Sequence, residues 1–368
     1  MPPLERLRAC IGSDGWLAST EARTNYRRVW ARDGCICGLA ALASGDDELL
    51  EATRRTLRTL GVHQGPSGAI PSNVGETVSY GGTAGRVDAT MWYLLSACLF
   101  DRLVGEPPHD DWWRVVELAE RVLRAWEHNE GGLVYVPMTG NWADEYALSG
   151  YLLYDQVLRL WTARELGRAC ERRGQELDHR RRPGQIEGRI LEAFVDDGAQ
   201  TRGHLLAGFH AGARHEQFDA LGHSLLVLLD VGSLEMRTRA LSQAEAITRH
   251  DLVPAFWPPI EPNDPRYRSL ELAAAEHLRN RPGRYHNGGL WPMVTGFWAA
   301  AARRMGEHAL ADRWADGIRR ANTSHGDPEY LDAFSGEPGG TRGQAWSIAA
   351  EVIARGLDPV IDLDDQSV

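Results

Sequence analysis

Six short clusters of polar and aromatic residues each stand just before an apolar, helix-like stretch of the sequence. Each cluster contains a carboxylate or amide side chain that could hydrogen-bond a hydroxyl group or transfer a proton. These anchors are Asp33, Asp88, Asp144, Asp219, Asn287 and Gln344, spaced 55, 56, 75, 68 and 57 residues apart. Each interval has room for two helices and two loops. The spacing therefore predicts six helical hairpins that deliver polar groups to one end of a closed ring.

Two of the carboxylates are candidates for acid–base chemistry. Hydrolysis of a glycosidic bond needs a protonated carboxyl group for the departing oxygen and an ionised carboxylate on the opposite face. Asp88 begins the second apolar helix, and Glu329 lies in a Pro-Glu-Tyr loop ahead of the last one. An acidic residue in a first helical turn is also a common cap or dipole partner, and a loop glutamate is generally a solvated charge. Asp144 is the alternative to Glu329 as the general base.

The other junction residues have the chemistry of sugar contacts. Arg32 and Asp33 could hydrogen-bond neighbouring sugar hydroxyls, or could form an ion pair that fixes the entry of the first helix. A second acidic and aromatic patch follows at Asn141–Glu145, and two glycines after His286 allow close approach of backbone to a ligand. The junction residues expected to line the pocket are Trp30, Arg32, Asp33, Trp142, Asp144, Glu145, His286, Asn287, Trp291, Gln344 and Trp346.

The helices that must position these residues fall into two classes by their apolar periodicity. The most apolar stripes predict inner helices, and they lie within 36–43, 87–98, 153–161, 218–229, 290–301 and 345–353. More highly charged stretches predict outer helices at roughly 47–60, 111–127, 185–195, 235–249, 308–321 and 268–279. Long loops rich in Gly, Pro, Ser and Asn lead into the inner helices, so they should gather at one mouth. The predicted fold is all-α: an (α/α)6 barrel with inner and outer rings.

Composition narrows the classes of function. A length of 368 residues favours two domains, but the sequence has no linker or composition shift, so we predict a single barrel domain over 1–368. A net charge of −11 argues against nucleic acid or an anionic membrane as a partner. All five cysteines are expected to be reduced. No apolar signal core or membrane span is seen, which favours a cytoplasmic protein. No histidine pairs with metal-ligand spacing and no nucleotide-binding motif occur, so no metal or cofactor is expected.

These motifs resemble the neutral/alkaline invertase family of inverting glycoside hydrolases, within the (α/α)6-barrel clan of glucosidases, trehalases and debranching enzymes. The similar segments occur in the same order: Arg32-Asp33, Gly85–Asp88 with Trp92, Phe218–Gly222, Tyr285–Pro292, and Pro328–Tyr330 followed by Gln344–Ala349. The resemblance implies that Asp88 is the general acid and Glu329 the general base. It also implies that Arg32, Asp33, His286, Asn287 and Gln344 line a sugar pocket, and that the substrate is a small saccharide. Trp30–Gly34 and Asn141–Asp144 resemble the glucosidase and debranching side of the clan instead.

Two other classes of function fit a helical barrel. Sugar 2-epimerases use histidines as acid and base, and here His286, His325 or His210 would carry the proton transfer. A non-catalytic barrel that binds carbohydrate is the third hypothesis. The paired carboxylates on two different loops argue against the non-catalytic barrel, and isomerisation of a free monosaccharide without reaction on glycosides would favour the epimerase. We predict an inverting, exo-acting hydrolase.

Overall fold

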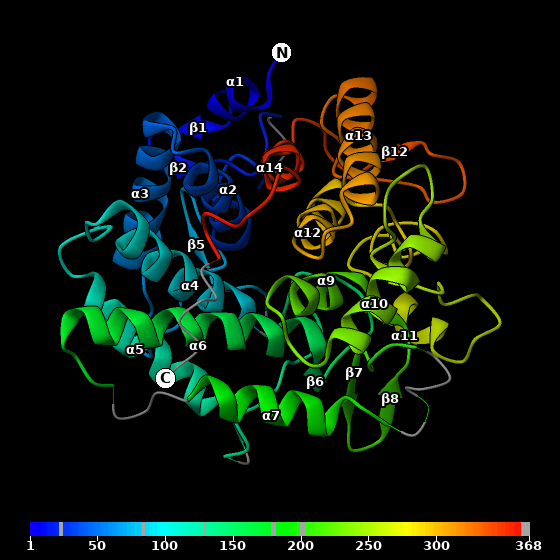
Figure 1. Cartoon of the computed structure of the whole chain (residues 1–368), viewed down its shortest axis with the longest axis horizontal. Coiled ribbons are helices and arrows are strands. Elements are labelled where there is room, and N and C mark those ends of the chain that lie inside the picture. The colour runs from blue at the N-terminus through cyan, green and yellow to red at the C-terminus, as the bar shows by residue number, and fades with distance from the viewer. Residues whose placement is uncertain are drawn as a thin grey trace.

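The computed structural model describes residues 1–21, 25–82, 85–128, 130–177, 182–196, 198 and 203–361. Six helices form an inner ring (Figure 1), and they are α2 (Ala31–Ser44), α4 (Val87–Val104), α6 (Leu153–Arg173), α9 (Ala220–Leu228), α12 (Pro292–Arg304) and α14 (Ala345–Ile353). Each packs against the next in chain order, and α14 packs back against α2. The inner ring therefore closes, as the (α/α)6 prediction requires.

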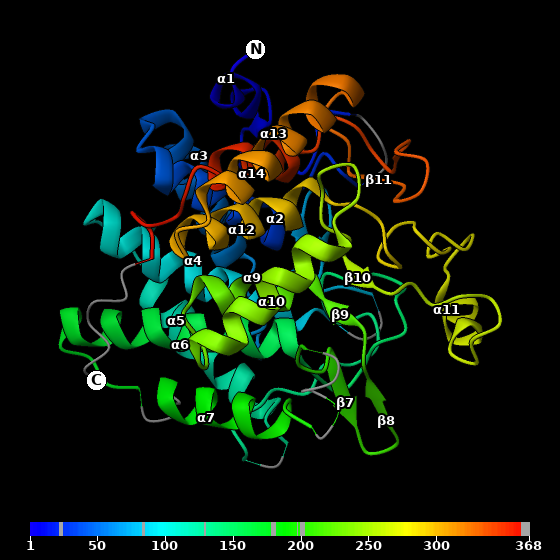
Figure 2. The ribbon, with the colours of Figure 1, turned by 45° about the vertical axis from the view of Figure 1, so that its right-hand side comes forward.

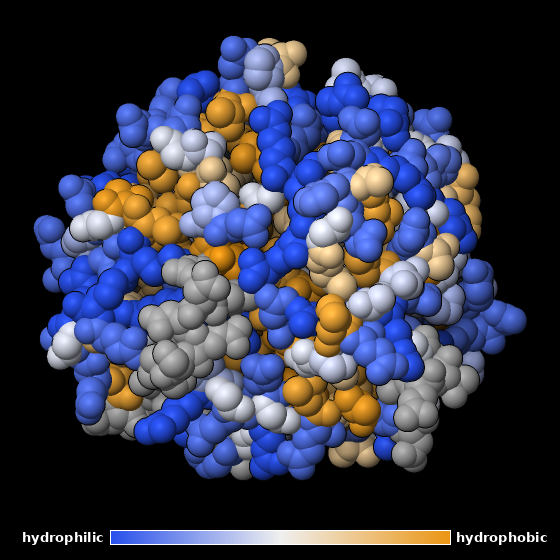
Figure 3. All heavy atoms as spheres, viewed as in Figure 1, coloured by the Kyte–Doolittle hydropathy of each residue, from blue (hydrophilic) through white to orange (hydrophobic). Residues whose placement is uncertain are grey.

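Five outer helices each follow an inner helix and pack against it, and they are α3 (Asp47–Val62), α5 (Trp112–Ala125), α7 (Pro183–Ala193), α10 (Leu234–Ile247) and α13 (His308–His325). Their charged faces point outward. The face of the molecule drawn in Figure 3 is accordingly rich in hydrophilic residues, with apolar residues between them.

The sixth outer position differs from the sequence prediction. It holds α1 (Pro3–Arg8), which packs against α14 and α3. The segment predicted there, 268–279, forms only the short helix α11 (Tyr267–Ala273) within the loop before α12, out to one side of the ring in Figure 2. The prediction failed for two reasons. The six residues of α1 are too few to show helical periodicity, and the sequence does not show that the two ends of the chain meet when the ring closes.

Short strands that the sequence did not predict pin the long loops to the ring. They are β1 (Ile11–Gly12), β2 (Gly15–Trp16), β3 (Val29–Trp30), β4 (Asn73–Val74), β5 (Val78–Ser79), β6 (Tyr151–Leu152), β7 (Gly208–His210), β8 (Ala213–His215), β9 (Phe218–Asp219), β10 (Phe256–Trp257), β11 (Tyr330–Leu331) and β12 (Pro338–Gly339). All their pairings are antiparallel. Runs of two or three residues are too short to show the alternation of a strand. β3, β6 and β9 run directly into α2, α6 and α9, so the loops are held where inner helices begin.

The core is largely apolar, and a buried ionic cluster lies between the inner and outer helices. Arg159 on α6 donates to both carboxylate oxygens of Glu120 on α5, each at 3.0 Å, and to Glu127 at 2.9 Å. All three side chains are buried. All five cysteines are buried thiols. Within the described residues, no helix is long and apolar enough to cross a bilayer.

Candidate active site

A cavity of about 330 Å³ opens at the end of the ring where the inner helices begin. Its lining includes the first turn of α2, the first turn of α14 and the residue that precedes α12. The lining residues are Ala18, Asn25, Tyr26, Trp30, Arg32, Asp33, Trp142, Asp144, Glu145, Ala275, Glu276, His277, Arg279, Tyr285, His286, Trp291, Glu329 and Trp346. The site thus draws on four of the six junctions.

Ten of the thirteen residues predicted for the site line this cavity, namely Trp30, Arg32, Asp33, Trp142, Asp144, Glu145, His286, Trp291, Glu329 and Trp346. Both Asp144 and Glu329, proposed from the sequence as alternative bases, are among them. Asp88, Asn287 and Gln344 are not part of the lining.

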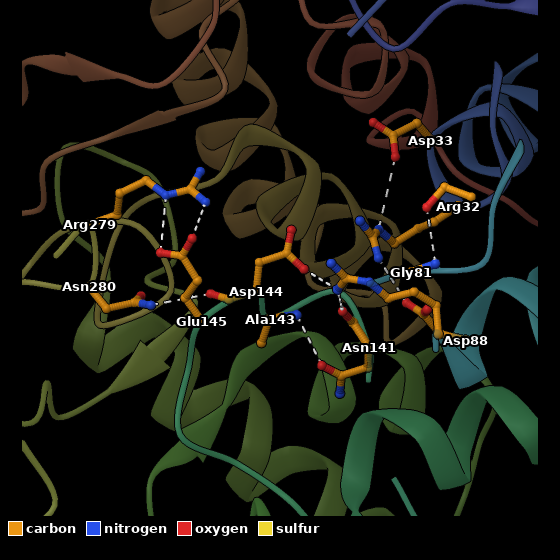
Figure 4. Close-up of polar contacts among 12 residues, drawn as sticks. Arg32, Asp33, Gly81, Asp88, Asn141, Ala143, Asp144, Glu145, Arg279 and Asn280 are labelled. Atoms are coloured by element: carbon orange, nitrogen blue, oxygen red, sulfur yellow. Dashed lines mark hydrogen bonds and ion pairs between the residues drawn. The ribbon is translucent and has the colours of Figure 1, made fainter. Parts of the chain in front are cut away.

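Asp88 lies below the floor of the cavity, by which we mean the part of its lining formed by Arg32 and Asp33. Its side chain is fully buried, and its Oδ2 accepts a hydrogen bond from Arg32 Nη1 at 3.0 Å and from the Tyr154 hydroxyl at 3.3 Å. Arg32, which lines the cavity, lies between Asp33 and Asp88 in Figure 4. The prediction of Asp88 as a cavity carboxylate fails because the second residue of α4 faces the neighbouring inner helices.

Asn287 and Gln344 are also buried away from the cavity. Asn287 holds the loop before it: its Oδ1 accepts from Ile260 N at 2.7 Å, and its Nδ2 donates to the carbonyls of Ile260 and Asn280. These bonds occupy both the oxygen and the nitrogen of the Asn287 amide, so the side chain has few hydrogen-bonding positions left for a sugar. Gln344 is fully buried as the residue before α14.

Glu329 is held by donors from two other segments. The Tyr26 hydroxyl donates to both of its carboxylate oxygens, at 3.0 and 3.1 Å, and Thr341 N donates to Oε2 at 2.9 Å. Burial raises the pKa of Glu329 to about 7, while the Thr341 and Tyr26 hydrogen bonds act in the opposite direction. A carboxyl group that titrates near neutral pH is suited to proton transfer.

Asp144 and Glu145 lie on the neighbouring loop, each beside an arginine. Asp144 pairs with Arg86 Nη1, and Glu145 Oε1 pairs with Arg279 Nη2 at 2.6 Å. Asn280 Nδ2 donates to the backbone carbonyl of Asp144 at 3.2 Å, which ties this loop to the α11 segment (Figure 4). About a quarter of the Asp144 side chain is exposed, so Asp144 is reachable by a ligand.

An aromatic wall carries polar atoms that the protein leaves free. The His286 ring stacks on Trp291, with centroids 4.8 Å apart and planes inclined by 9°, and meets the Trp142 edge at 4.8 Å. Neither ring nitrogen of His286 has a hydrogen-bond partner in the described part of the chain, nor has the indole nitrogen of Trp142 or Trp346. Burial lowers the pKa of His286 well below its usual value, so the imidazole is neutral. Buried polar atoms without partners mark positions that a ligand would satisfy.

Several lining residues were missed by the sequence analysis. Tyr26 comes from the loop before β3, and Arg279 and Tyr285 come from the loop before α12, where Arg279 Cζ lies 4.5 Å from the Tyr285 ring centroid. Arg279 fell in a segment predicted to be an outer helix. Tyr285 begins the family-like segment Tyr285–Pro292 but was not named as a site residue. No local pattern distinguishes Tyr26 and Arg279 from ordinary loop residues, because their role depends on loops that meet only in the folded ring.

The fourth junction is structural. Asp219 caps α9 by accepting from Gly222 N at 3.0 Å, and it also accepts from Tyr154 N at 3.2 Å. Burial raises its pKa to about 7.

Of the three histidines considered for an epimerase, His286 lines the cavity, while His210 and His325 are not part of its lining. No group of three or more potential metal ligands is found within the described residues.

Comparison with known proteins gives sequence relatives among plant invertases. The chain is 25% identical over 186 residues to neutral/alkaline invertase 1, mitochondrial, of Oryza sativa subsp. japonica, which is 48% of this chain and 28% of that protein. It is 28% identical over 174 residues to the probable alkaline/neutral invertase F of Arabidopsis thaliana, 44% of this chain and 33% of that protein. The matched part is a third or less of the length of these two relatives.

Solved structures share the whole fold. The GH63 mannosylglycerate hydrolase of Thermus thermophilus, in complex with glucose, superposes with a TM-score of 0.68 at 16% identity, covering 95% of this chain and 98% of that one. The glucoamylase of Hormoconis resinae superposes with a TM-score of 0.66 at 12% identity, covering 97% and 72%. The family model of the mannosylglycerate hydrolase MGH1-like glycoside hydrolase domain matches residues 160–347, just over half of the chain. The chain therefore belongs to the family of MGH1-like glycoside hydrolase domains.

Proposed function

We propose that this protein is an inverting, exo-acting glycoside hydrolase that removes one terminal sugar from a small neutral saccharide or glycoside. One observation carries the proposal: Asp144 and Glu329, from loops far apart in the sequence, line the same cavity. Both carboxylates also raise the pKa of the Tyr285 hydroxyl, after the larger effect of its burial. Two carboxyl groups across one cavity are what glycoside hydrolysis requires.

In the proposed mechanism Asp144, rather than Asp88, is the general acid. Its carboxyl proton passes to the glycosidic oxygen as the bond from that oxygen to the anomeric carbon breaks. Arg86 stabilises the carboxylate that Asp144 becomes when it has given up the proton. Glu329 takes a proton from a water molecule whose oxygen attacks the anomeric carbon from the opposite face. The configuration at that carbon is inverted, which requires the two carboxyl groups to stand roughly 6.5–9.5 Å apart in the complex.

The floor of the cavity supports the exo mode. Arg32 and Asp33 lie there with little exposure, above the fully buried Asp88. A polysaccharide chain could not continue past this floor, so a terminal sugar fits better than an internal one. The free nitrogens of His286, Trp142 and Trp346 supply hydrogen bonds for its hydroxyls, and the indoles supply apolar faces.

Glucosides and mannosides of small alcohols are the first substrates to test. The Thermus thermophilus mannosylglycerate hydrolase was crystallised with glucose, and also with Tris and D-glycerate. Sucrose belongs in the same panel because invertases are among the sequence relatives. A cytosolic invertase of rice is another relative, at 27% identity over 143 residues, and it supports a cytoplasmic location for this protein.

The carboxylate variants Asp144→Asn and Glu329→Gln test the assignment. Each should fold normally and lose about 10³-fold or more in turnover of an alkyl glycoside, since acid or base assistance contributes roughly 10²–10⁴. Asp144→Asn should retain most activity on a glycosyl fluoride, because fluoride leaves without a proton, whereas Glu329→Gln should lose activity on both substrates. Near-normal turnover in both variants would reject the mechanism. Isomerisation of a free monosaccharide by the wild type, without hydrolysis of glycosides, would favour an epimerase.

A further inference from the structure

We propose that Asp88 is a positioning residue: it fixes the guanidinium of Arg32 at the cavity floor so that Arg32 can hydrogen-bond the hydroxyls of the terminal sugar. The inference rests on the proposed function, because it concerns sugar recognition in the same cavity. Asp88 would therefore contribute to sugar binding without touching the sugar, since it is not part of the cavity lining.

Three inner helices meet at one oxygen of Asp88. Arg32 Nη1 from α2 donates to Oδ2 at 3.0 Å, and the Tyr154 hydroxyl from α6 donates to the same atom at 3.3 Å. The Tyr154 oxygen in turn accepts from Trp92 Nε1 on α4 at 2.7 Å. Trp92 donates to Tyr154, and both Tyr154 and Arg32 donate to Asp88. Because these donors come from fixed helices, they hold the carboxylate in a single orientation.

Arg32 is the only member of this series that also lines the cavity, among the four residues Arg32, Asp88, Trp92 and Tyr154. Its Nε lies 4.0 Å from Asp33 Oδ2, and its Cζ lies 5.6 Å from the Trp346 ring centroid. Its Nε has no hydrogen-bond partner in the described part of the chain. A guanidinium is planar and carries five N–H donors. Fixing Nη1 on Asp88 therefore sets the plane in which the remaining donors meet a ligand.

A buried carboxylate is costly unless it is paired, so this arrangement is not an ordinary way to fill a core. Asp88 is fully buried, and only 8% of the Arg32 side chain is exposed. Without the charge on Asp88, the nearest carboxylate to attract Arg32 is Asp33, which lies on the cavity side. The guanidinium would then turn away from its present plane, while Asp144 and Glu329 would keep their places.

The variant Asp88→Asn tests the proposal, because asparagine keeps the shape and removes the charge. We expect kcat/KM to fall about 10- to 100-fold, mainly through KM, as a charge-assisted hydrogen bond to the sugar is weakened. The loss should be equal for an alkyl glycoside and for the glycosyl fluoride of the same sugar, and the pH profile should be unchanged. A loss confined to the alkyl glycoside would make Asp88 the acid and overturn the proposal. Wild-type kinetics would also overturn it.

Asp155→Asn is the matched control. Asp155 is equally buried, on the neighbouring inner helix α6, and accepts from Asn141 Nδ2 at 2.7 Å, whereas the ion pairs of Arg32 are with Asp33 and Asp88. Asparagine keeps the shape of Asp155 at a position that does not pair with Arg32, so KM should stay near the wild-type value. In an Arg32→Met background, Asp88→Asn should add no further loss, since one interaction cannot be removed twice. Additive losses would contradict the proposal.

Two further measurements separate this proposal from a failure of the variant to fold and from a failure of the proposed mechanism. If Asp88→Asn does not fold, Tyr154→Phe removes the second donor to Asp88 and should raise KM in the same direction, whereas an unchanged KM would overturn the proposal. Calorimetric titration with glucose reports sugar binding without catalysis. Weaker glucose binding by Asp88→Asn would support the positioning role even if Asp144→Asn and Glu329→Gln kept their activity and the proposed mechanism failed. Unchanged glucose binding would reject the role.

Discussion

Single residues in the cavity and just below it differ in how many of their polar atoms hydrogen-bond within the protein. The amide of Asn287 is hydrogen-bonded within its own loop. Oδ2 of Asp88 accepts from Arg32 and Tyr154, whereas its Oδ1 has no partner in the described residues. The ring nitrogens of His286 and the indole nitrogens of Trp142 and Trp346 have no partner in the described residues. Sequence types alone could not make this division, because asparagine, aspartate and histidine have the same hydrogen-bonding capacity in both settings.

The pH dependence of activity follows from Glu329. Its raised pKa of about 7 means that the carboxylate needed as a base is lost as the pH falls through that value. On a glycosyl fluoride, which needs no general acid, we expect kcat/KM to rise with pH up to about 7 and then to level. Tyr26→Phe removes a hydrogen bond that favours the carboxylate, so the rise should move to higher pH. Kinetics between about pH 5 and 9 measure this limb.

Tyr80→Phe is the control for that experiment. Tyr80 donates to the carbonyl of His63 at 2.8 Å and is not part of the cavity lining. Its substitution should leave the limb in place. A Tyr26→Phe limb at the wild-type position or at lower pH would show that Glu329 does not govern the profile.

At the scale of elements, each hairpin is held by packing between its inner and outer helix, and in one place by buried charge. Arg159 on α6 reaches across to Glu120 on α5 and to Glu127 just after it. Apolar periodicity predicted both helices, since it reports which stripe is buried. It gave no sign of the ion cluster, because arginine and glutamate are also the residues of a solvated face.

Arg159→Met should therefore be strongly destabilising. It leaves the buried carboxylate of Glu120 without the cation it pairs with, while Glu127 still pairs with Arg124. Removing one partner of a buried pair costs roughly 3–5 kcal/mol. The free energy of unfolding from urea denaturation measures the effect. Arg239→Met is the control: Arg239 pairs with Glu235 one turn earlier on the exposed face of α10, and such pairs contribute about 0.5 kcal/mol or less. Equal losses in the two variants would contradict a stabilising role for the buried cluster.

Over the whole molecule, the chain closes its ring by joining its two ends. Arg6 on α1 pairs with Asp327 and with Glu351 on α14, each at 2.5 Å. Asp327 is two residues before Glu329, so the same contact ties the end of the ring to the loop that carries the proposed base. The sequence predicted six repeating units but not this pairing, which depends on residues more than 300 positions apart.

Most of the site could be predicted because its residues stand at a repeated place, the start of each inner helix. Arg32, Asp33 and Trp346 occupy first turns that face the cavity. Asp88 occupies the same kind of place on α4 but faces its neighbours. Which way a first turn faces depends on the curvature of the closed ring, and local sequence does not contain that information. That residues 1–368 form one domain remains a prediction.

The most direct test of the central claim is the configuration of the first-formed product. In proton NMR spectra recorded within the first minutes of hydrolysis, the signal of the anomer opposite to that of the substrate should appear first and then equilibrate by mutarotation. That result would follow if water, activated by Glu329, attacks the face opposite to the bond protonated by Asp144. Initial release of the anomer with the configuration of the substrate would contradict it.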